Sequence, residues 1–373
     1  MTRRFKCASA LLCAVCLLPL AVCGASAIES NIDAYREEFA LDDLYDGVDD
    51  ETKDLLEAFG VSDVNLASLY AVSPRRVLDA LLGVAGNVLR EPLLYLAAAA
   101  LVAALTAVAN AFSSSPEAVQ TVGGCVLALL AAAPAARTVT AAFSALEVVG
   151  GFSVAFAGVF CAVISAAGGV ASASAYAGFT AALGTLLTEG FAGFARPAVN
   201  ALSSAAFFSA FDVFTFSEKL SGLVKKTALF ILGLSATLYA GLLSAKGLLA
   251  AGSDSVASRG VRFLIGKSVP VVGGAVSESL SAVMAGLSVI RGTVGVFGIL
   301  TFVLTVLPTF LSLCAWSFVF TASAALCETF GCGRARTVPL ILRDALEILA
   351  VLFVLCALVF TVGVGIMLRE VKP

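Results

Sequence analysis

Long runs of apolar residues dominate this chain and restrict it to a membrane fold. The run Leu93–Phe112 has no charged residue over 20 positions, and a helix of about 20 residues crosses the hydrocarbon core of a bilayer. Only 13% of the residues are charged and 60% are hydrophobic, whereas about a quarter of an average soluble domain is charged. The runs do not alternate as barrel strands do. The sequence therefore predicts an all-α, polytopic membrane protein.

Further apolar runs follow, and we expect residues 93–373 to form a polytopic helical membrane domain. Clear runs predict spanning helices at Leu93–Phe112, Ala118–Ala136, Val148–Ala171, Ala228–Ala245, Val294–Phe320 and Ala345–Leu368. Tyr176–Phe194 and Ala198–Phe216 are less certain because they contain Glu189 and Asp212, and Val269–Ile290 is interrupted by a proline. Five or six spans are therefore expected, and nine at most. The basic residues of the loops do not decide the orientation.

Residues 1–27 have the layout of a secretory signal peptide. Three basic residues precede the short apolar core Cys7–Val22, and small residues at Ala25 and Ala27 fit a cleavage site. We expect cleavage after Ala27. The alternative is an uncleaved anchor helix, for which the apolar core is short.

Residues 28–75 form an acidic segment that we expect to be exported. Thirteen acidic residues face three basic ones, giving a net charge of −10, whereas the rest of the chain from residue 76 carries +4. Leu55, Leu56 and Phe59 are spaced for a short amphipathic helix, but the segment is too small for much of a core. It is either a solvated leader or a docking surface for a partner.

Residues 76–92 predict an amphipathic helix that lies in the membrane interface before the first span. Ser73 is a suitable N-cap and Pro74 a suitable first-turn residue. Pro92 is expected to end the helix, because the residue before a proline disfavours the helical conformation.

Several classes of active site are excluded by composition. The chain has no histidine, so histidine-ligated metals, histidine-assisted nucleophiles and haem–histidine ligation are ruled out. No phosphate-binding glycine loop or paired aspartates are present, so we predict no catalytic, cofactor or metal site and no nucleic-acid or small-molecule partner. Cys327 and Cys332 lie in a predicted loop, where a disulfide is possible outside the cytoplasm.

The stretch SRGVRFLIGKSVPVVGGAVSES, Ser258–Ser279, joins two different amphipathic halves. The first half has a basic face, typical of a helix lying flat in the membrane interface. A proline and a glycine pair then interrupt it, and the second half carries a stripe of small polar residues with one glutamate. The candidate functional or packing residues are Arg259, Arg262, Lys267, Pro270, Gly273, Gly274, Ser277, Glu278 and Ser281.

Glu278 has more than one interpretation. An ionisable residue at membrane depth is costly and indicates function. Alternatively, Glu278 lies near the lipid headgroups or pairs with Arg291. Glu189 and Asp212 are weaker intramembrane candidates of the same kind.

The same region carries a family resemblance. The sequence SDSVASRGVRFLIGKSVPVVGGAVSESLSAVMAG, and in particular KSVPVVGG at Lys267–Gly274, resembles the stage III sporulation protein AE family of endospore-forming bacteria. The layout of signal, acidic exported segment and polytopic body is similar too. The resemblance implies a non-enzymatic subunit, in the mother-cell membrane around the forespore, of a multi-protein channel or secretion-like complex that links the two cells. Its partners would be the other membrane subunits and the lipid bilayer.

A second hypothesis is a small-molecule or ion transporter or channel that acts on its own. Broken helices and intramembrane carboxylates are features of transporters, and Glu189, Asp212 and Glu278 would then line the path. The sequence contains no visible internal repeat to support this hypothesis.

Overall fold

The computed structural model describes residues 44–45, 47–61, 74–185, 192–210, 218–268, 273–333 and 335–369. Within these residues the regular structure is entirely helical, which confirms the all-α prediction. The helices are α4 (Asp50–Phe59), α6 (Pro74–Phe112), α7 (Pro116–Ala166), α8 (Val170–Thr185), α9 (Ala192–Ala210), α10 (Glu218–Ser268), α11 (Gly273–Thr329) and α12 (Thr337–Arg369). The predicted signal peptide, residues 1–27, lies outside the described residues, and its cleavage stays a prediction.

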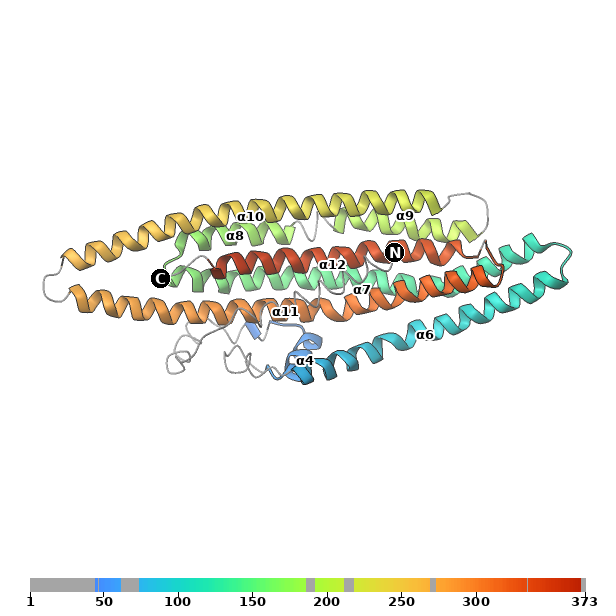
Figure 1. Cartoon of the computed structure of the whole chain (residues 1–373), viewed down its shortest axis with the longest axis horizontal. Coiled ribbons are helices and arrows are strands. Elements are labelled where there is room, and N and C mark those ends of the chain that lie inside the picture. The colour runs from blue at the N-terminus through green and yellow to red at the C-terminus, as the bar shows by residue number, and fades with distance from the viewer. Residues whose placement is uncertain are drawn as a thin grey trace.

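The long helices lie side by side in one elongated bundle (Figure 1). Helix α12 lies in the middle and contacts α7, α9, α10 and α11. Helices α8 and α9 follow one another along the side of α10, and α6 and α7 form a hairpin that extends beyond the end of the bundle. The short helix α4, from the acidic segment, packs against α11 and α6.

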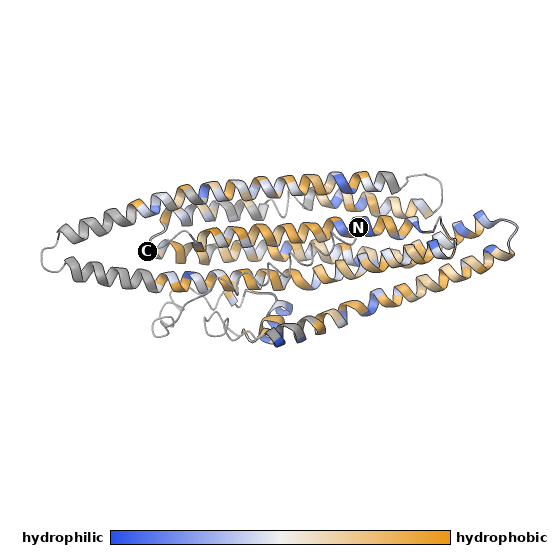
Figure 2. Cartoon of the chain, in the orientation of Figure 1, coloured by the Kyte–Doolittle hydropathy of each residue, from blue (hydrophilic) through white to orange (hydrophobic). Residues whose placement is uncertain are grey.

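Five helices are long and apolar enough to cross a membrane. They contain the stretches Leu82–Phe112, Pro116–Ala166, Ser221–Lys246, Gly286–Thr329 and Thr337–Leu368. Hydrophobic residues follow these helices over most of their length (Figure 2). Helix α7 alone has 51 residues and is about 76 Å long, more than twice the roughly 30 Å of a hydrocarbon core. The chain is a multi-pass membrane protein, and its longest helices are longer than a hydrocarbon core is thick.

The predicted helix end at Pro92 is wrong, because helix α6 continues through this residue. Two predicted spans are also not separate helices: α7 continues through Pro134 to Ala166 and so contains Ala118–Ala136 and most of Val148–Ala171. A proline inside a helix costs about 3 kcal/mol, and packing of the residues that follow Pro92 offsets this cost. Just after Pro92, the ring of Tyr95 lies 5.8 Å from that of Trp316 and 5.4 Å from that of Phe320. That residues 76–92 lie in the membrane interface stays a prediction.

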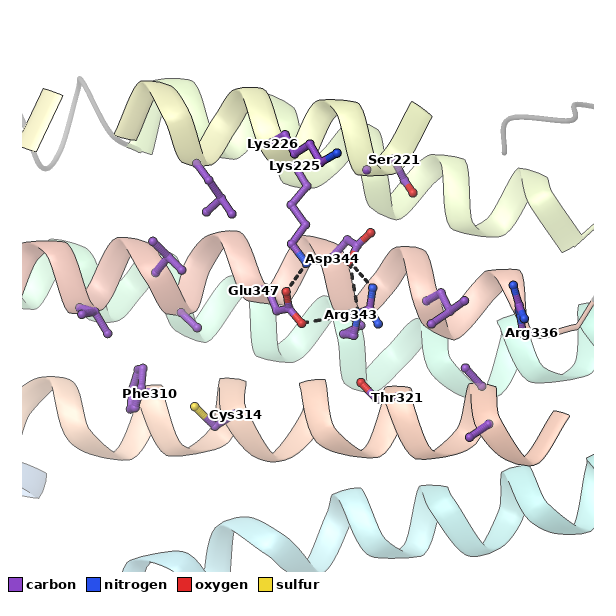
Figure 3. Close-up of a pocket in the computed structure, with 18 of the residues that line it drawn as sticks. Ser221, Lys225, Lys226, Phe310, Cys314, Thr321, Arg336, Arg343, Asp344 and Glu347 are labelled. Atoms are coloured by element: carbon purple, nitrogen blue, oxygen red, sulfur yellow. Dashed lines mark hydrogen bonds and ion pairs between the residues drawn. The ribbon is translucent and has the colours of Figure 1, made fainter. Parts of the chain in front are cut away.

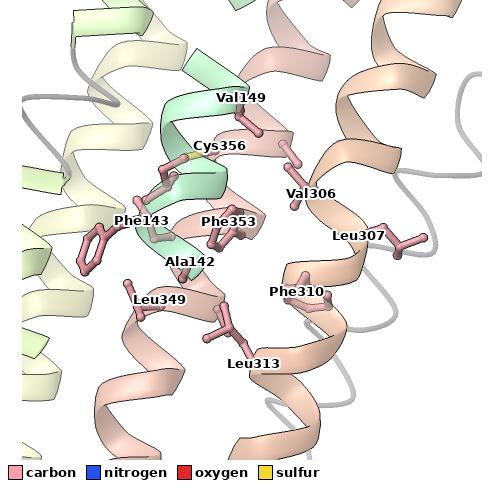
Figure 4. Packing of buried hydrophobic residues seen from close by; sticks show 14 of the residues in the cluster. Ala142, Phe143, Val149, Val306, Leu307, Phe310, Leu313, Leu349, Phe353 and Cys356 are labelled. Carbon is pink, nitrogen blue, oxygen red and sulfur yellow. The ribbon is translucent and has the colours of Figure 1, made fainter. Parts of the chain in front are cut away.

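The core is built from aromatic and branched side chains of α7, α11 and α12 (Figure 4). The rings of Phe302 and Phe360 stack with centroids 4.1 Å apart. The ring centroid of Phe156 of α7 lies 5.5 Å from that of Phe360. Gly298 of α11 allows the ring of Phe156 of α7 to pack directly against the α11 backbone, because a Cβ at Gly298 would overlap this ring. The small residues of the sequence thus matter at particular contacts between helices.

The end of α11 explains the pair of cysteines in the predicted loop. The N–H of Cys332 donates to the carbonyl of Cys327 at 2.8 Å, and that of Gly331 donates to Glu328 at 3.1 Å, with Gly331 at φ 75°. This is a Schellman motif, in which a left-handed glycine ends the helix and the flanking apolar residues pack together. Cys327 and Cys332 take these two apolar positions as buried free thiols. Burial raises the pKa of the Cys332 thiol, so it is a poor nucleophile.

Candidate functional site

A pocket of about 820 Å³ lies between α10, α11 and α12, near the turn that joins the last two helices (Figure 3). Its lining changes along its length. Phe310, Cys314 and Val354 lie towards the middle of the bundle, whereas Ser221 and Arg336 lie towards the turn. The pocket is therefore apolar at one end and polar at the other.

A charged network crosses this pocket and joins α10 to α12. The ammonium of Lys225 donates to Asp344 Oδ1 at 2.9 Å and also pairs with Glu347 Oε2. The side chains of Lys225 and Asp344 are only 14% and 9% exposed. An isolated charge at such a depth is costly, so the two helices stabilise each other's charged groups.

Arg343 completes the network from within α12. Its Nη2 and Nε donate to Asp344 Oδ1 at 2.7 and 3.2 Å, and Nε lies 3.5 Å from Glu347 Oε1. The pair Arg343 and Glu347 is spaced i,i+4, which puts both on one face of the helix. Two cations thus face two carboxylates, and the network is neutral overall. Such a network holds a fixed arrangement in a water-poor site, because losing one member leaves an uncompensated charge.

A second ion pair lies at the polar end of the pocket. Arg336 Nη1, just before α12, lies 3.0 Å from Glu328 Oε1 at the end of α11. Together with the Schellman motif, this pair holds the turn between the two helices.

The sequence did not identify this site. Lys225 and Arg343 lie just outside the predicted spans Ala228–Ala245 and Ala345–Leu368, and Glu347 lies inside the second span without a predicted partner. The available signal was an arginine and two carboxylates within five residues at the edge of an apolar run, with i,i+3 and i,i+4 spacing. No local pattern indicates that Lys225, more than 100 residues earlier, is their partner.

The residues that the sequence did select lie at the opposite end of the bundle. Arg259, Arg262 and Lys267 are in the last turns of α10, and Gly273, Gly274, Ser277, Glu278 and Ser281 are in the first turns of α11. The expected interruption is present, since α10 ends at Ser268 and α11 begins at Gly273. Pro270, Glu189 and Asp212 lie outside the described residues. For the other selected residues the structure describes the helix to which each belongs, but not the side chain. Their roles stay predictions.

Ser258–Lys267 continues α10 in one uninterrupted helix from Glu218, and that it lies flat at the membrane surface stays a prediction. One expectation for this stretch needs correction. Glu278 was considered a partner for Arg291, but both belong to the continuous helix α11. Their 13-residue separation corresponds to about 20 Å along the axis, which is too far for an ion pair.

The pocket and the selected stretch are well separated. Lys225 and Lys267 lie on the same helix, about 60 Å apart. Among the described residues, no group of three or more cysteines and carboxylates is placed to hold a metal ion.

Comparison with known proteins identifies the family. The family model for stage III sporulation protein AE matches residues 79–370. The chain belongs to this family. A protein of Bacillus subtilis (strain 168) named stage III sporulation protein AE is 23% identical over 143 residues, covering 38% of this chain and 36% of that protein. The aligned part is thus about a third of that relative's length. No solved structure matches the chain.

The match to the stage III sporulation protein AE family covers almost the whole bundle. It includes the pocket, the network and the stretch Ser258–Ser279, whereas α4 precedes it. The family description indicates a role in sporulation and does not describe an enzyme family.

Proposed function

We propose that this chain is a non-enzymatic membrane subunit of a multi-protein channel or secretion-like complex that links mother cell and forespore and is needed for forespore development. The family match over residues 79–370 carries the proposal, because it ties the membrane bundle itself to sporulation. The subunit would reside in the mother-cell membrane around the forespore, with other membrane subunits as partners. Its longest helices, such as α7, α10 and α11, are longer than a bilayer is thick and would leave surface outside the lipid for such contacts.

The second candidate is a small-molecule or ion transporter acting on its own. One observation favours it: the 820 Å³ pocket between α10, α11 and α12 is crossed by a buried ionic network. Ionisable groups inside a helical membrane bundle commonly mark a path for ions or substrates. The residues involved are Lys225, Arg343, Asp344 and Glu347, in place of the three carboxylates suggested by the sequence.

Affinity purification separates the two candidates. The full-length chain, tagged at its C-terminus and expressed from its own promoter, is extracted in mild detergent from sporulating cells. The subunit proposal expects other membrane proteins made during sporulation to co-purify in fixed ratio, and an unrelated tagged multi-pass protein to recover none of them. Purification of the chain alone, also after cross-linking, would contradict the subunit proposal and favour the transporter.

A further inference from the structure

Four long helices share a layer without charged residues. The uncharged segments are 148–166 of α7, 227–245 of α10, 292–327 of α11 and 348–368 of α12. The segments of α7, α10 and α12 have 19 to 21 residues, which corresponds to the thickness of a hydrocarbon core, and the segment of α11 is longer. On α10 and α12 the layer ends at Lys226 and Glu347 on one side and at Lys246 and Arg369 on the other.

Direct contacts place these segments side by side. The ion pairs of Lys225 with Asp344 and Glu347 align the starts of the layer on α10 and α12. Farther along, the Leu243 side chain lies against Gly363. The stacked rings of Phe302 and Phe360 connect α11 to the middle of the layer on α12. The uncharged layer is thus continuous across the bundle.

The outer face of α10 at this depth is apolar. Leu234, Leu238 and Leu242 are 48%, 60% and 60% exposed. They lie one turn apart along the same face and belong to the part of α10 that is apolar enough to span a membrane. This face suits contact with lipid.

Helix α4 lies at the same depth, but its outward side is acidic, whereas the outer face of α10 is apolar. The Thr52 hydroxyl donates to Thr305 Oγ1 at 3.2 Å, less than one turn from Phe302, and the rings of Tyr45 and Phe297 are 6.3 Å apart. Leu55, Leu56 and Phe59 are buried against the bundle. The outward side of α4 carries the exposed carboxylates of Asp50, Glu51, Asp54 and Glu57.

These two faces cannot share one environment. A carboxylate in the middle of a bilayer costs about 3 kcal/mol or more, and four of them on one short helix are incompatible with hydrocarbon. Conversely, the leucine face of α10 is suited to lipid. We propose that, at the depth of Phe360, lipid covers α10 and water covers α4, so that the bundle forms part of a wall between the bilayer and an aqueous path.

The inference deepens the proposed function. It rests on that function in one respect: the other subunits of the complex would enclose the aqueous path. Hydrocarbon cannot border the aqueous side, so further protein subunits must enclose it. The wall itself depends only on the two faces of this chain.

The position of α6 suggests an alternative place for the bilayer, which the test must distinguish from the proposed one. Its uncharged run Leu93–Phe112 is displaced along the bundle, because Tyr95 packs against Trp316 and Phe320, about 20 Å from Thr305. Leu101 on this run is 61% exposed. A bilayer around the α6–α7 hairpin would leave the shared layer outside the lipid.

Site-directed labelling tests the inference on the full chain in native membranes from sporulating cells, sonicated so that reagents reach both surfaces. Single cysteines replace Leu238, Asp54 and Leu101 in a background whose native cysteines are alanine. Each variant is treated with a membrane-impermeant maleimide and with a maleimide that partitions into the bilayer. Ser253→Cys, on α10 beyond Lys246 and exposed, is the matched control for water access.

The expected result is opposite labelling at equal depth. Leu238→Cys should prefer the bilayer reagent by at least about tenfold, and Asp54→Cys should prefer the water-soluble reagent by a similar factor. Water access at Leu238 together with lipid labelling at Leu101 would overturn the inference, as would lack of water access at Asp54. These outcomes are independent of co-purification, so the wall can fail while the subunit role stands, and the reverse.

Discussion

Asp254 near the end of α10 caps the N-terminus of α8, where its Oδ2 accepts the backbone N–H of Ser172 at 2.8 Å. Its Oδ1 accepts the N–H of Ala171, also at 2.8 Å. The first N–H groups of a helix have no partner within it, and here the partner comes from a residue more than 80 positions away. Asp254 is buried, so this contact fixes the α7–α8 turn against α10.

Replacing Asp254 should therefore loosen the bundle at this end. Asp254→Ala leaves one buried and one part-buried N–H group without their acceptor, and we expect a loss of about 1–3 kcal/mol in the free energy of unfolding. Asp254→Asn keeps one acceptor oxygen and should lose less. Thermal unfolding of the detergent-solubilised chain measures both. The nearby exposed Ser253→Ala is the control, and an equal effect there would contradict the capping role.

The network in the pocket predicts a clear difference between adjacent lysines. Lys225→Met removes the cation shared by Asp344 and Glu347 and should destabilise the chain by about 3–5 kcal/mol. Lys226→Met changes an exposed neighbour and should have little effect. The double variant Lys225→Met/Glu347→Gln should recover part of the loss, since it removes one charge of each sign. Equal stability of the two lysine variants would refute the assigned role.

Close packing of α7 against α11 predicts that Gly298 tolerates no side chain. A Cβ there overlaps the Phe156 ring, whereas one at Gly292, on the same helix, meets nothing within 4 Å. Gly298→Ala should cost about 1–3 kcal/mol through overpacking, and Gly292→Ala should be neutral or stabilising. Adding Phe156→Leu should relieve part of the cost. The comparison is made by thermal unfolding, and no recovery in the double variant would argue against overlap as the cause.

The α11–α12 turn offers a test of backbone conformation alone. Gly331 has φ 75° and open space around its Cα, so Gly331→Ala should cost about 1–2 kcal/mol through the left-handed conformation. Gly333, two residues later, also has open space and no such φ. Gly333→Ala is therefore the control. Identical melting temperatures for the two variants would contradict the Schellman ending.

Sequence reasoning was most successful where the signal was long and local. Runs such as Val294–Phe320 predicted membrane helices, and KSVPVVGG marked both the family and the break between α10 and α11. It failed at Pro92, where local propensity is outweighed by packing of Tyr95 against Trp316 and Phe320 of α11.

The candidate site was less accessible to such reasoning, because its parts are distant in sequence. Lys225 meets Asp344 across 119 positions, and Asp254 meets Ser172 across 82. In the sequence, Lys225 and Asp344 are visible only as charges at the edges of apolar runs. The two faces at the depth of Phe360 were equally hidden, since the sequence does not reveal that α4 packs against the middle of α11.

The most direct measurement of the central claim is a count of heat-resistant spores from a strain that lacks this gene. The account predicts that vegetative growth is unchanged, that the spore count falls by orders of magnitude, and that the wild-type gene expressed in the mother cell restores it. A normal spore count, or a growth defect in vegetative cells as large as the defect in sporulation, would contradict it.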